Sequence, residues 1–285
     1  MPEISKSGKA SVYPPPPSPS GGPVLRRGLC GLAQPELKQA LYTPGFHFRE
    51  ASVLLVTSGR MDLDNGSNQV SIGGDASLLL VDAGGHADLL KTPARDSKRF
   101  RSLFLTLSTT LLRSFQRQNS SLLSSHSARA GYQQLVLDTD LKTTFLRIFD
   151  GADVQRVSDA RLQCRLTELL WSLAERGYVF KERKQDGTAE RLRALISDDP
   201  GQQWTANEAG RRLAMSEATL RRRLVGESVH FEDILIEVRM HHAMMLLQTT
   251  PWSIPRIALA CGYQSRSRFS ERFRTRFGYS PSTVR

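Results

Sequence analysis

The chain has 285 residues, of which 39% are hydrophobic and 24% are charged, so its composition is that of an ordinary globular protein. This length exceeds one typical domain and predicts two. The formal net charge of +11 favours an anionic partner, nucleic acid before membrane, because no run of about twenty apolar residues is present. Cys30, Cys164 and Cys261 lie far apart without metal-ligand spacing, which predicts reduced thiols in a cytoplasmic protein.

The first 23 residues contain the segment VYPPPPSPSGGP. They lack the apolar stretch and the cleavage signal of a secretory peptide. We predict a disordered, partly polyproline tail over residues 1–23, and favour it over a proline-rich ligand for a partner protein.

Short β-rich runs alternate with turns from residue 24 to residue 107. Asn65-Gly66 is a strong tight-turn signal, and strands at this spacing predict a small sandwich or barrel. The expected strands are Ser52–Thr57, Arg60–Leu63, Gln69–Ile72, Ser77–Val81, His86–Lys91 and Phe100–Leu107.

A helical stretch is expected over residues 108–176. Its last helix, from about Ser158, carries an apolar stripe that must be buried against something. The stripe consists of Leu162, Leu166, Leu169, Leu170 and Leu173. It packs on the chain's own sheet domain, pairs with the same helix of a second copy, or does both. The polar residues 177–189 have the composition of an interdomain linker.

The segment 204–225, WTANEAGRRLAMSEATLRRRLV, has the pattern of a helix-turn-helix unit. Its first helix should start near Thr205 or Asn207, whose side-chain oxygens accept from exposed backbone N–H groups. Ser216 caps a second helix in which Leu220 and Leu224 lie on one face. Arginines project around the other faces, so this helix packs with one side and offers the other to a ligand.

The segment 253–277 repeats the pattern. Ser253 caps the first helix, and Gly262 supplies the left-handed conformation of a tight turn. Ser265 caps the second helix, whose buried stripe is Phe269, Phe273 and Phe277.

The basic residues of the last third are all arginines. No lysine follows Lys184, and residues 253–285 contain seven arginines and one acid, Glu271. Solubility does not demand arginine over lysine, whereas bidentate recognition of bases and phosphates does. Two such units therefore favour binding of double-stranded DNA over a merely solvated helix face. Helix geometry assigns phosphate contacts to Arg223, Arg272, Arg274 and Arg276.

These residues resemble the AraC/XylS family of bacterial transcription regulators over about a hundred residues. The matching positions include Trp204-Thr205, Met215-Ser216, Leu220, Arg222, Gly226, Arg239, Ala243, Leu246-Leu247, Ser253-Ile254, Ile257-Ala258, Gly262-Tyr263, Ser267, Phe269-Ser270, Phe273, Phe277-Gly278, Pro281 and Arg285. The resemblance implies a connecting helix, roughly 231–248, that sets two recognition helices about one DNA turn, roughly 34 Å, apart.

Carried over by position, the resemblance implies base contacts from both recognition helices. The residues are Ala218, Arg221 and Arg222 in the first helix, and Arg266, Ser267, Arg268 and Glu271 in the second. Glu271 departs from the family pattern, where arginine is common, and a glutamate can only accept hydrogen bonds.

The N-terminal part is similar to the cupin-type barrel that such regulators carry, with Gly74-Asp75 at a characteristic turn. His47 and His86 stand alone, without a His-x-His pair, so metal-dependent catalysis is disfavoured and no metal or cofactor is expected. The barrel either encloses a small effector or is filled by its own side chains and serves as a dimerisation scaffold. His241 and His242 are adjacent on the connecting helix; we expect an apolar face there, with one histidine toward solvent.

The sequence thus predicts a mixed α and β protein. A cupin-like β-barrel (24–107) with a helical dimerisation segment (108–176) precedes an all-α DNA-binding domain (190–285) with two helix-turn-helix motifs. The predicted function is a cytoplasmic, nucleoid-associated regulator, not an enzyme, that forms a homodimer, binds promoter DNA and recruits RNA polymerase as an activator, with a small-molecule effector as a further partner. The alternatives are an architectural DNA-binding protein and, less favoured, a cupin enzyme with a DNA-binding tail.

Overall fold

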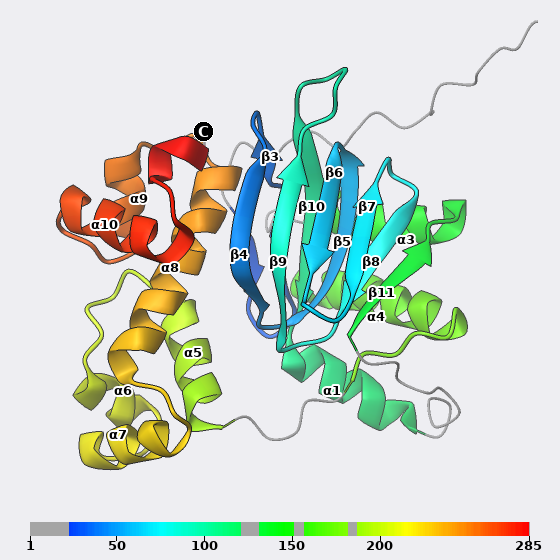
Figure 1. Ribbon diagram of the computed structural model, residues 1–285. Coiled ribbons are helices and arrows are strands. Elements are labelled where there is room, and N and C mark those ends of the chain that lie inside the picture. The colour runs from blue at the N-terminus through cyan, green and yellow to red at the C-terminus, as the bar shows by residue number, and fades with distance from the viewer. Residues whose placement is uncertain (1–22, 121–130, 151–156, 182–186, 285) are drawn as a thin grey trace, which may run out of the picture.

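The computed structural model describes residues 23–120, 131–150, 157–181 and 187–284. A sheet-rich part and a helical part lie side by side (Figure 1). The expected tail falls almost entirely on residues 1–22, outside the described residues, as do residues 182–186 of the expected linker.

The strands form two antiparallel sheets. The larger sheet has the order β1-β2-β10-β5-β8-β11, with β3 also pairing with β10, and the smaller one has the order β4-β9-β6-β7. The strands of the larger sheet are β1 (Val24–Arg26), β2 (Cys30–Ala33), β3 (Glu36–Leu37), β5 (Ala51–Ser58), β8 (Ser77–Val81), β10 (Phe100–Leu107) and β11 (Tyr132–Val136). Those of the smaller sheet are β4 (Leu41–Phe48), β6 (Arg60–Asp64), β7 (Gln69–Gly73) and β9 (Gly85–Thr92). All six expected strands are present, but they belong to two sheets, and the strand pairing of the described residues does not close into a barrel.

The central strands of the larger sheet are apolar on both faces because both faces are covered. In β5 and β8, Leu54 and Leu79 face the smaller sheet, while Val53 and Leu80 face helices. Phe48, Met61 and Phe100 fill the space between the sheets and are at most 1% exposed. The sequence left open whether this domain encloses a small effector or is filled by its own side chains. The buried positions of these residues agree with a filled interior.

Strand β4 lies at the edge of the smaller sheet, and sequence reasoning missed it. Pro44-Gly45 resembles a turn, but here it forms an irregularity within the strand, where the pairing with β9 shifts between Thr43 and Phe46. Gly45 has φ +53, a left-handed conformation that a glycine adopts without strain. The irregularity leaves the carbonyls of Pro44 and Gly45 available to another element.

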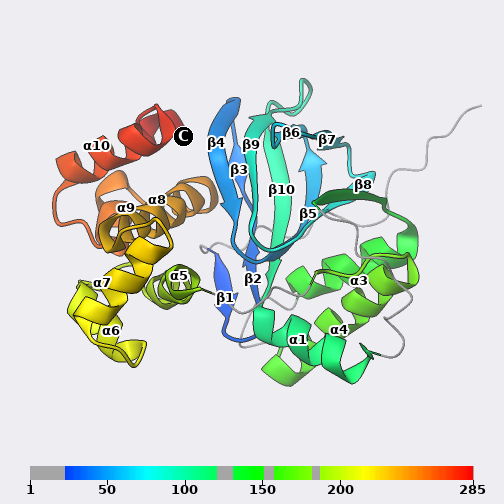
Figure 2. The same cartoon turned by 60° about the horizontal axis from the view of Figure 1, so that its bottom comes forward.

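Helices cover the outer face of the larger sheet (Figure 2). They are α1 (Thr109–Gln118), α3 (Thr139–Asp150) and α4 (Asp159–Glu175). The predicted helical stretch also contains a strand, β11, which extends the larger sheet beside β8.

The five leucines assigned to dimerisation lie in the chain's own core. Leu162, Leu166, Leu169, Leu170 and Leu173 are 0–4% exposed and pack in one cluster with residues of β5, β10 and α3. Packing against the chain's own sheet therefore explains the stripe, and these side chains offer no area to a partner. The exposed side of α4 carries polar residues such as Arg161, Gln163 and Glu168.

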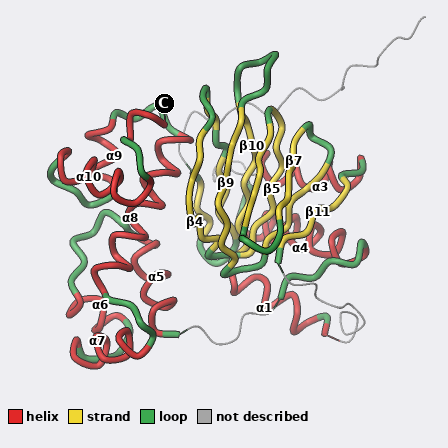
Figure 3. The backbone as a smooth tube through the Cα atoms, viewed as in Figure 1, coloured by secondary structure: helices red, strands yellow, loops and turns green. Residues whose placement is uncertain are grey.

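The helical part contains α5 (Thr188–Asp198), α6 (Ala206–Arg212), α7 (Glu217–Gly226), α8 (Phe231–Thr249), α9 (Ile254–Ala260), α10 (Arg266–Phe277) and the 3₁₀ turn η1 (Pro281–Val284). Helix α5 starts inside the range expected for the linker. The long helix α8 runs past both helix-turn-helix units (Figure 3). Ile234 and Val238 belong to the first unit's core, and Met240 and Met244 to the second's.

The core of the second unit is continuous with the core between the sheets. Lys91 of β9 lies at this junction, 8% exposed, and its ammonium donates to Gln248 Oε1 of α8 at 2.7 Å. Burial lowers the pKa of Lys91 to about 8. Because no carboxylate is among the causes of this shift, the charged amine is held at a cost to stability.

Lys91→Met should change how stability depends on pH. The unfolded chain binds this proton up to about pH 10.4, the folded chain only up to about 8, so Lys91 makes the free energy of unfolding rise between those values. The full rise is about 3 kcal/mol at the ordinary 1.4 kcal/mol per pKa unit. Chemical denaturation of both proteins from pH 7 to 10.5 measures the free energy of unfolding, and the Lys91→Met protein should lack this rise. Parallel curves of the free energy of unfolding against pH would show that Lys91 is not a buried cation.

Candidate nucleic-acid interface

The first helix-turn-helix unit consists of α6 and α7. Thr205 caps α6 by accepting from the N–H of Glu208, and Ser216 caps α7 by accepting from the N–H of Thr219. In the turn, Ala214 has φ +58 and a Cβ on Gly210 would lie 2.9 Å from the carbonyl oxygen of Met215. The close approach of the turn to α6 therefore requires glycine at position 210.

Helix α7 presents its predicted DNA contacts to solvent. Ala218, Arg221, Arg222 and Arg223 are exposed, whereas Leu220 and Leu224 are buried. Arg221 is already engaged, because its guanidinium contacts Glu217 at 2.9 Å and Glu232 at 3.2 Å. It must leave or share these carboxylates to contact a base.

The second unit consists of α9 and α10. Ser253 and Ser265 cap the two helices as predicted, and Gly262 in the turn has φ +77. Phe269, Phe273 and Phe277 are at most 3% exposed, which fixes the opposite face of α10 toward solvent. The predicted DNA contacts that are exposed on α10 are Arg266, Ser267, Arg268, Glu271, Arg272 and Arg274.

Arg276, the fourth predicted phosphate contact, is only partly exposed because it binds the sheet domain. It donates to the carbonyl oxygens of Pro44 at 3.2 Å and Gly45 at 2.8 Å. The irregularity in β4 supplies these acceptors. In this arrangement Arg276 joins the two parts of the molecule.

Two further arginines lie against tryptophans near the starts of the first helices. The guanidinium of Arg212 is 5.0 Å from the Trp204 ring, and that of Arg256 is 4.1 Å from the Trp252 ring. Both side chains are exposed. In the sequence, a tryptophan stands just before the helix cap of both units, and this repeat is the signal that could have predicted the two arginine–tryptophan contacts.

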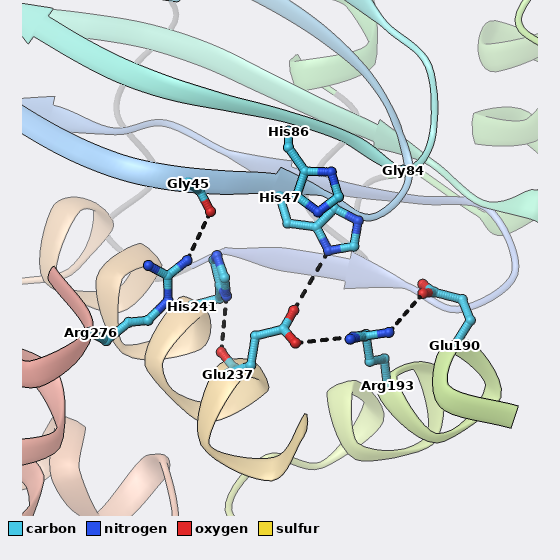
Figure 4. Close-up of a pocket in the computed structure, with 9 residues that line it drawn as sticks. All are labelled: Gly45, His47, Gly84, His86, Glu190, Arg193, Glu237, His241 and Arg276. Carbon is cyan, nitrogen blue, oxygen red and sulfur yellow. Dashed lines mark hydrogen bonds and ion pairs between the residues drawn. The ribbon is translucent and has the colours of Figure 1, made fainter. Parts of the chain in front are cut away.

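A polar cavity of about 460 Å³ lies between the sheet domain and the helical part (Figure 4). Its charged and imidazole residues come from β4, β9, α5, α8 and α10. They are His47, His86, Glu190, Arg193, Glu237, His241 and Arg276. The sequence did not predict this cluster, because its residues lie far apart in the chain and meet only where the sheet domain packs against the helical part.

Glu237 of α8 lies at the centre of this cluster. Its carboxylate is 3.6 Å from His47 Nδ1, 3.9 Å from Arg49 and 3.1 Å from Arg193 Nε. Burial alone would raise the pKa of Glu237, but the hydrogen bond with His47 and the charges of Arg193 and Arg49 outweigh it and lower the pKa. The ionised carboxylate of Glu237 thus links α8 to His47 of β4 and to Arg193 of α5.

His47 and His86, expected to stand alone, are cross-strand neighbours whose rings stack 4.1 Å apart. Burial lowers the pKa of His86, and the charge of the neighbouring His47, when protonated, lowers it further. Among the described residues no group of three or more metal-binding side chains lies together.

Neither histidine of α8 is exposed, so the expectation that one of the two would point to solvent was wrong. His241 packs on Phe46 and Phe277, and its Nδ1 lies 2.9 Å from the carbonyl oxygen of Glu237. Burial lowers the pKa of His241, and it lowers the pKa of His242 to about 4. Both are therefore neutral near pH 7.

A helix-turn-helix domain family matches residues 210–285. Among curated proteins, the transcriptional regulator SirC of Salmonella typhimurium is 33% identical over 106 residues, 37% of this chain and 36% of SirC. The regulator GadX of Escherichia coli is 32% identical over 98 residues, 34% of this chain and 36% of GadX. The match thus spans little more than a third of either relative, and both relatives are named as transcriptional regulators.

The fold extends the similarity beyond the C-terminal part. Fatty-acid-bound ToxT of Vibrio cholerae superposes with a TM-score of 0.60 over 90% of this chain and 94% of that chain, at 16% identity. Both halves of the structure thus follow one known arrangement. The C-terminal part of the chain is a helix-turn-helix domain of the AraC/XylS type, as the sequence resemblance predicted.

Arg276→Ala and Arg274→Ala should differ although both residues lie on α10. Arg274 is exposed, so its loss should make the negative slope of log affinity against log salt shallower by about one unit. Arg276 is held by the carbonyls of β4, so its loss should leave that slope unchanged. DNA-binding titrations at several salt concentrations measure both. Equal decreases would show that Arg276 turns to phosphate in the complex.

Proposed function

We propose that this protein is a sequence-specific DNA-binding transcription regulator that binds promoter DNA with both helix-turn-helix units. One observation carries the proposal: two helices, α7 and α10, each share an apolar core with part of the same helix α8, and both present exposed arginines. Insertion of each helix into a major groove would place guanidinium forks against base edges. The SirC and GadX relatives support a regulator.

The remaining parts of the proposal concern partners. A regulator of this type would act as an activator that recruits RNA polymerase, bind its sites as a homodimer and work in the cytoplasm. In the described part of the chain no helix has the length and apolarity needed to cross a membrane. In vitro transcription with purified polymerase tests activation, and sedimentation with and without DNA tests the dimer. Unchanged transcript levels would contradict the activator role, and a monomer both with and without DNA would contradict the homodimer.

Control by a small-molecule effector is also proposed. ToxT has been solved with a bound fatty acid. Here Phe48, Met61 and Phe100 fill the space between the sheets, so we place the effector in the polar cavity beside Glu237. An effector there would alter the contacts between β4, α5 and α8, and so the freedom of the DNA-binding part. A compound that raises the melting temperature without changing DNA affinity would contradict this coupling.

Arg222→Ala and Arg266→Ala test the main proposal. Each should cost about 1–3 kcal/mol of binding free energy, roughly 5- to 150-fold, on the cognate site, and relax base preference at one position. Arg223→Ala and Arg272→Ala are the matched controls, since their loss should weaken cognate and random DNA alike. Competition titrations on both DNAs measure this.

The architectural alternative makes the opposite prediction. A specific regulator should prefer its site over competitor DNA by about a thousandfold or more. Weak preference in the unmodified protein, with equal losses for all four variants on both DNAs, would favour a binder without sequence specificity.

A further inference from the structure

The two helix-turn-helix units have separate apolar cores. Leu213, Leu220 and Leu224 of the first unit cluster with α5 and the first half of α8. Ile257, Phe269 and Phe273 of the second cluster with the second half of α8 and the sheets. Helix α8 joins the two units, and any further contact that fixes one against the other must lie outside these two cores.

Arg239 of α8 lies at the boundary between these cores and is 8% exposed. Its Nε donates to the carbonyl oxygen of Pro200 at 3.1 Å, and its Nη2 to that of Gln202 at 2.8 Å. Both acceptors belong to the loop that leads into α6. The guanidinium thus bonds α8 to the entrance of the first unit.

The same guanidinium also contacts the turn of the second unit. It lies 5.5 Å from the centre of the Tyr263 ring, and a Cβ on Gly262 would approach Nη2 to within 2.4 Å. Gly262 therefore serves the left-handed turn and leaves room for the arginine. Gln203 closes the joint from the loop side by donating to the carbonyl oxygen of Gly262 at 3.3 Å.

We infer that Arg239 is a positioning residue that fixes the second unit relative to the first, and with it the spacing of the two DNA segments that the protein reads. The inference rests on the proposed function. A planar fork is needed, because one group must donate to two carbonyls while its face lies on Tyr263. Lysine keeps the charge but has a single ammonium, so it cannot reproduce this geometry.

The first test uses the full chain and duplexes that carry both segments of its selected site, at the native spacing and with one base pair inserted or removed. One base pair moves a segment by about 3.4 Å and turns it by about 35°. The unmodified protein should discriminate against the altered spacings by about tenfold or more. Arg239→Lys should reduce this discrimination to about twofold while binding a single segment with unchanged affinity.

The matched control is Arg191→Lys. Arg191 of α5 also donates to a carbonyl oxygen, that of Leu213 at 3.3 Å, but this contact joins α5 to the first unit and does not involve the second. It should keep the spacing preference. An Arg239→Lys protein that discriminates as strongly as the unmodified chain would overturn the inference, as would a control that loses discrimination equally.

A second measurement needs no DNA and separates this inference from the proposed function. Val225 of α7 is 59% exposed and Leu259 of α9 is 63% exposed, so Val225→Cys and Leu259→Cys accept spin labels in a Cys164→Ser background. The distance distribution between the labels should be narrow, and should broaden with Arg239→Lys.

Gln203→Ala, an exposed change on the far side of the joint, should broaden the distribution less and serves if Arg239→Lys does not fold. Unchanged distributions in the variants that fold would show that Arg239 does not set the arrangement. Absence of any two-segment site for the unmodified protein would instead remove the proposed function.

Discussion

Helix α8 is buried against three neighbours at once, and the arrangement of the molecule depends on it. Its first half completes the core of one helix-turn-helix unit, its second half completes the other, and its remaining face lies on the sheet domain. A helix surrounded in this way is apolar on most sides. Three of its polar residues, Glu237, Arg239 and Gln248, each bond another element, and His241 packs on Phe46 and Phe277.

These polar junctions differ in kind. At the sheet domain, ionised and imidazole groups surround a cavity, an arrangement that a bound molecule or a change in protonation would disturb. Between the two units, a single guanidinium bonds neutral carbonyl oxygens with little solvent access. The first junction suits a contact that changes, and the second suits one that persists. Regulation through β4 would then move both DNA-binding units as one body.

Local patterns were sufficient to predict much of the helical part. The serine caps, the left-handed Gly262 and the phenylalanine stripe each follow from short-range rules, so these elements were predicted with their boundaries. The sheet domain was predicted less completely, because the Pro44-Gly45 irregularity hides β4 and because β11 follows a helix. The roles of Arg276 and Glu237 were beyond sequence reasoning, since their partners lie far away in the chain and meet them only through domain docking.

Selection of bound duplexes from a random pool with the purified full chain tests the central claim most directly. Two rigidly spaced recognition helices should recover a motif of two conserved blocks whose centres lie about one helical turn, 10–10.5 base pairs, apart. A pool without an enriched motif, or one with a single block and no fixed neighbour, would contradict the account.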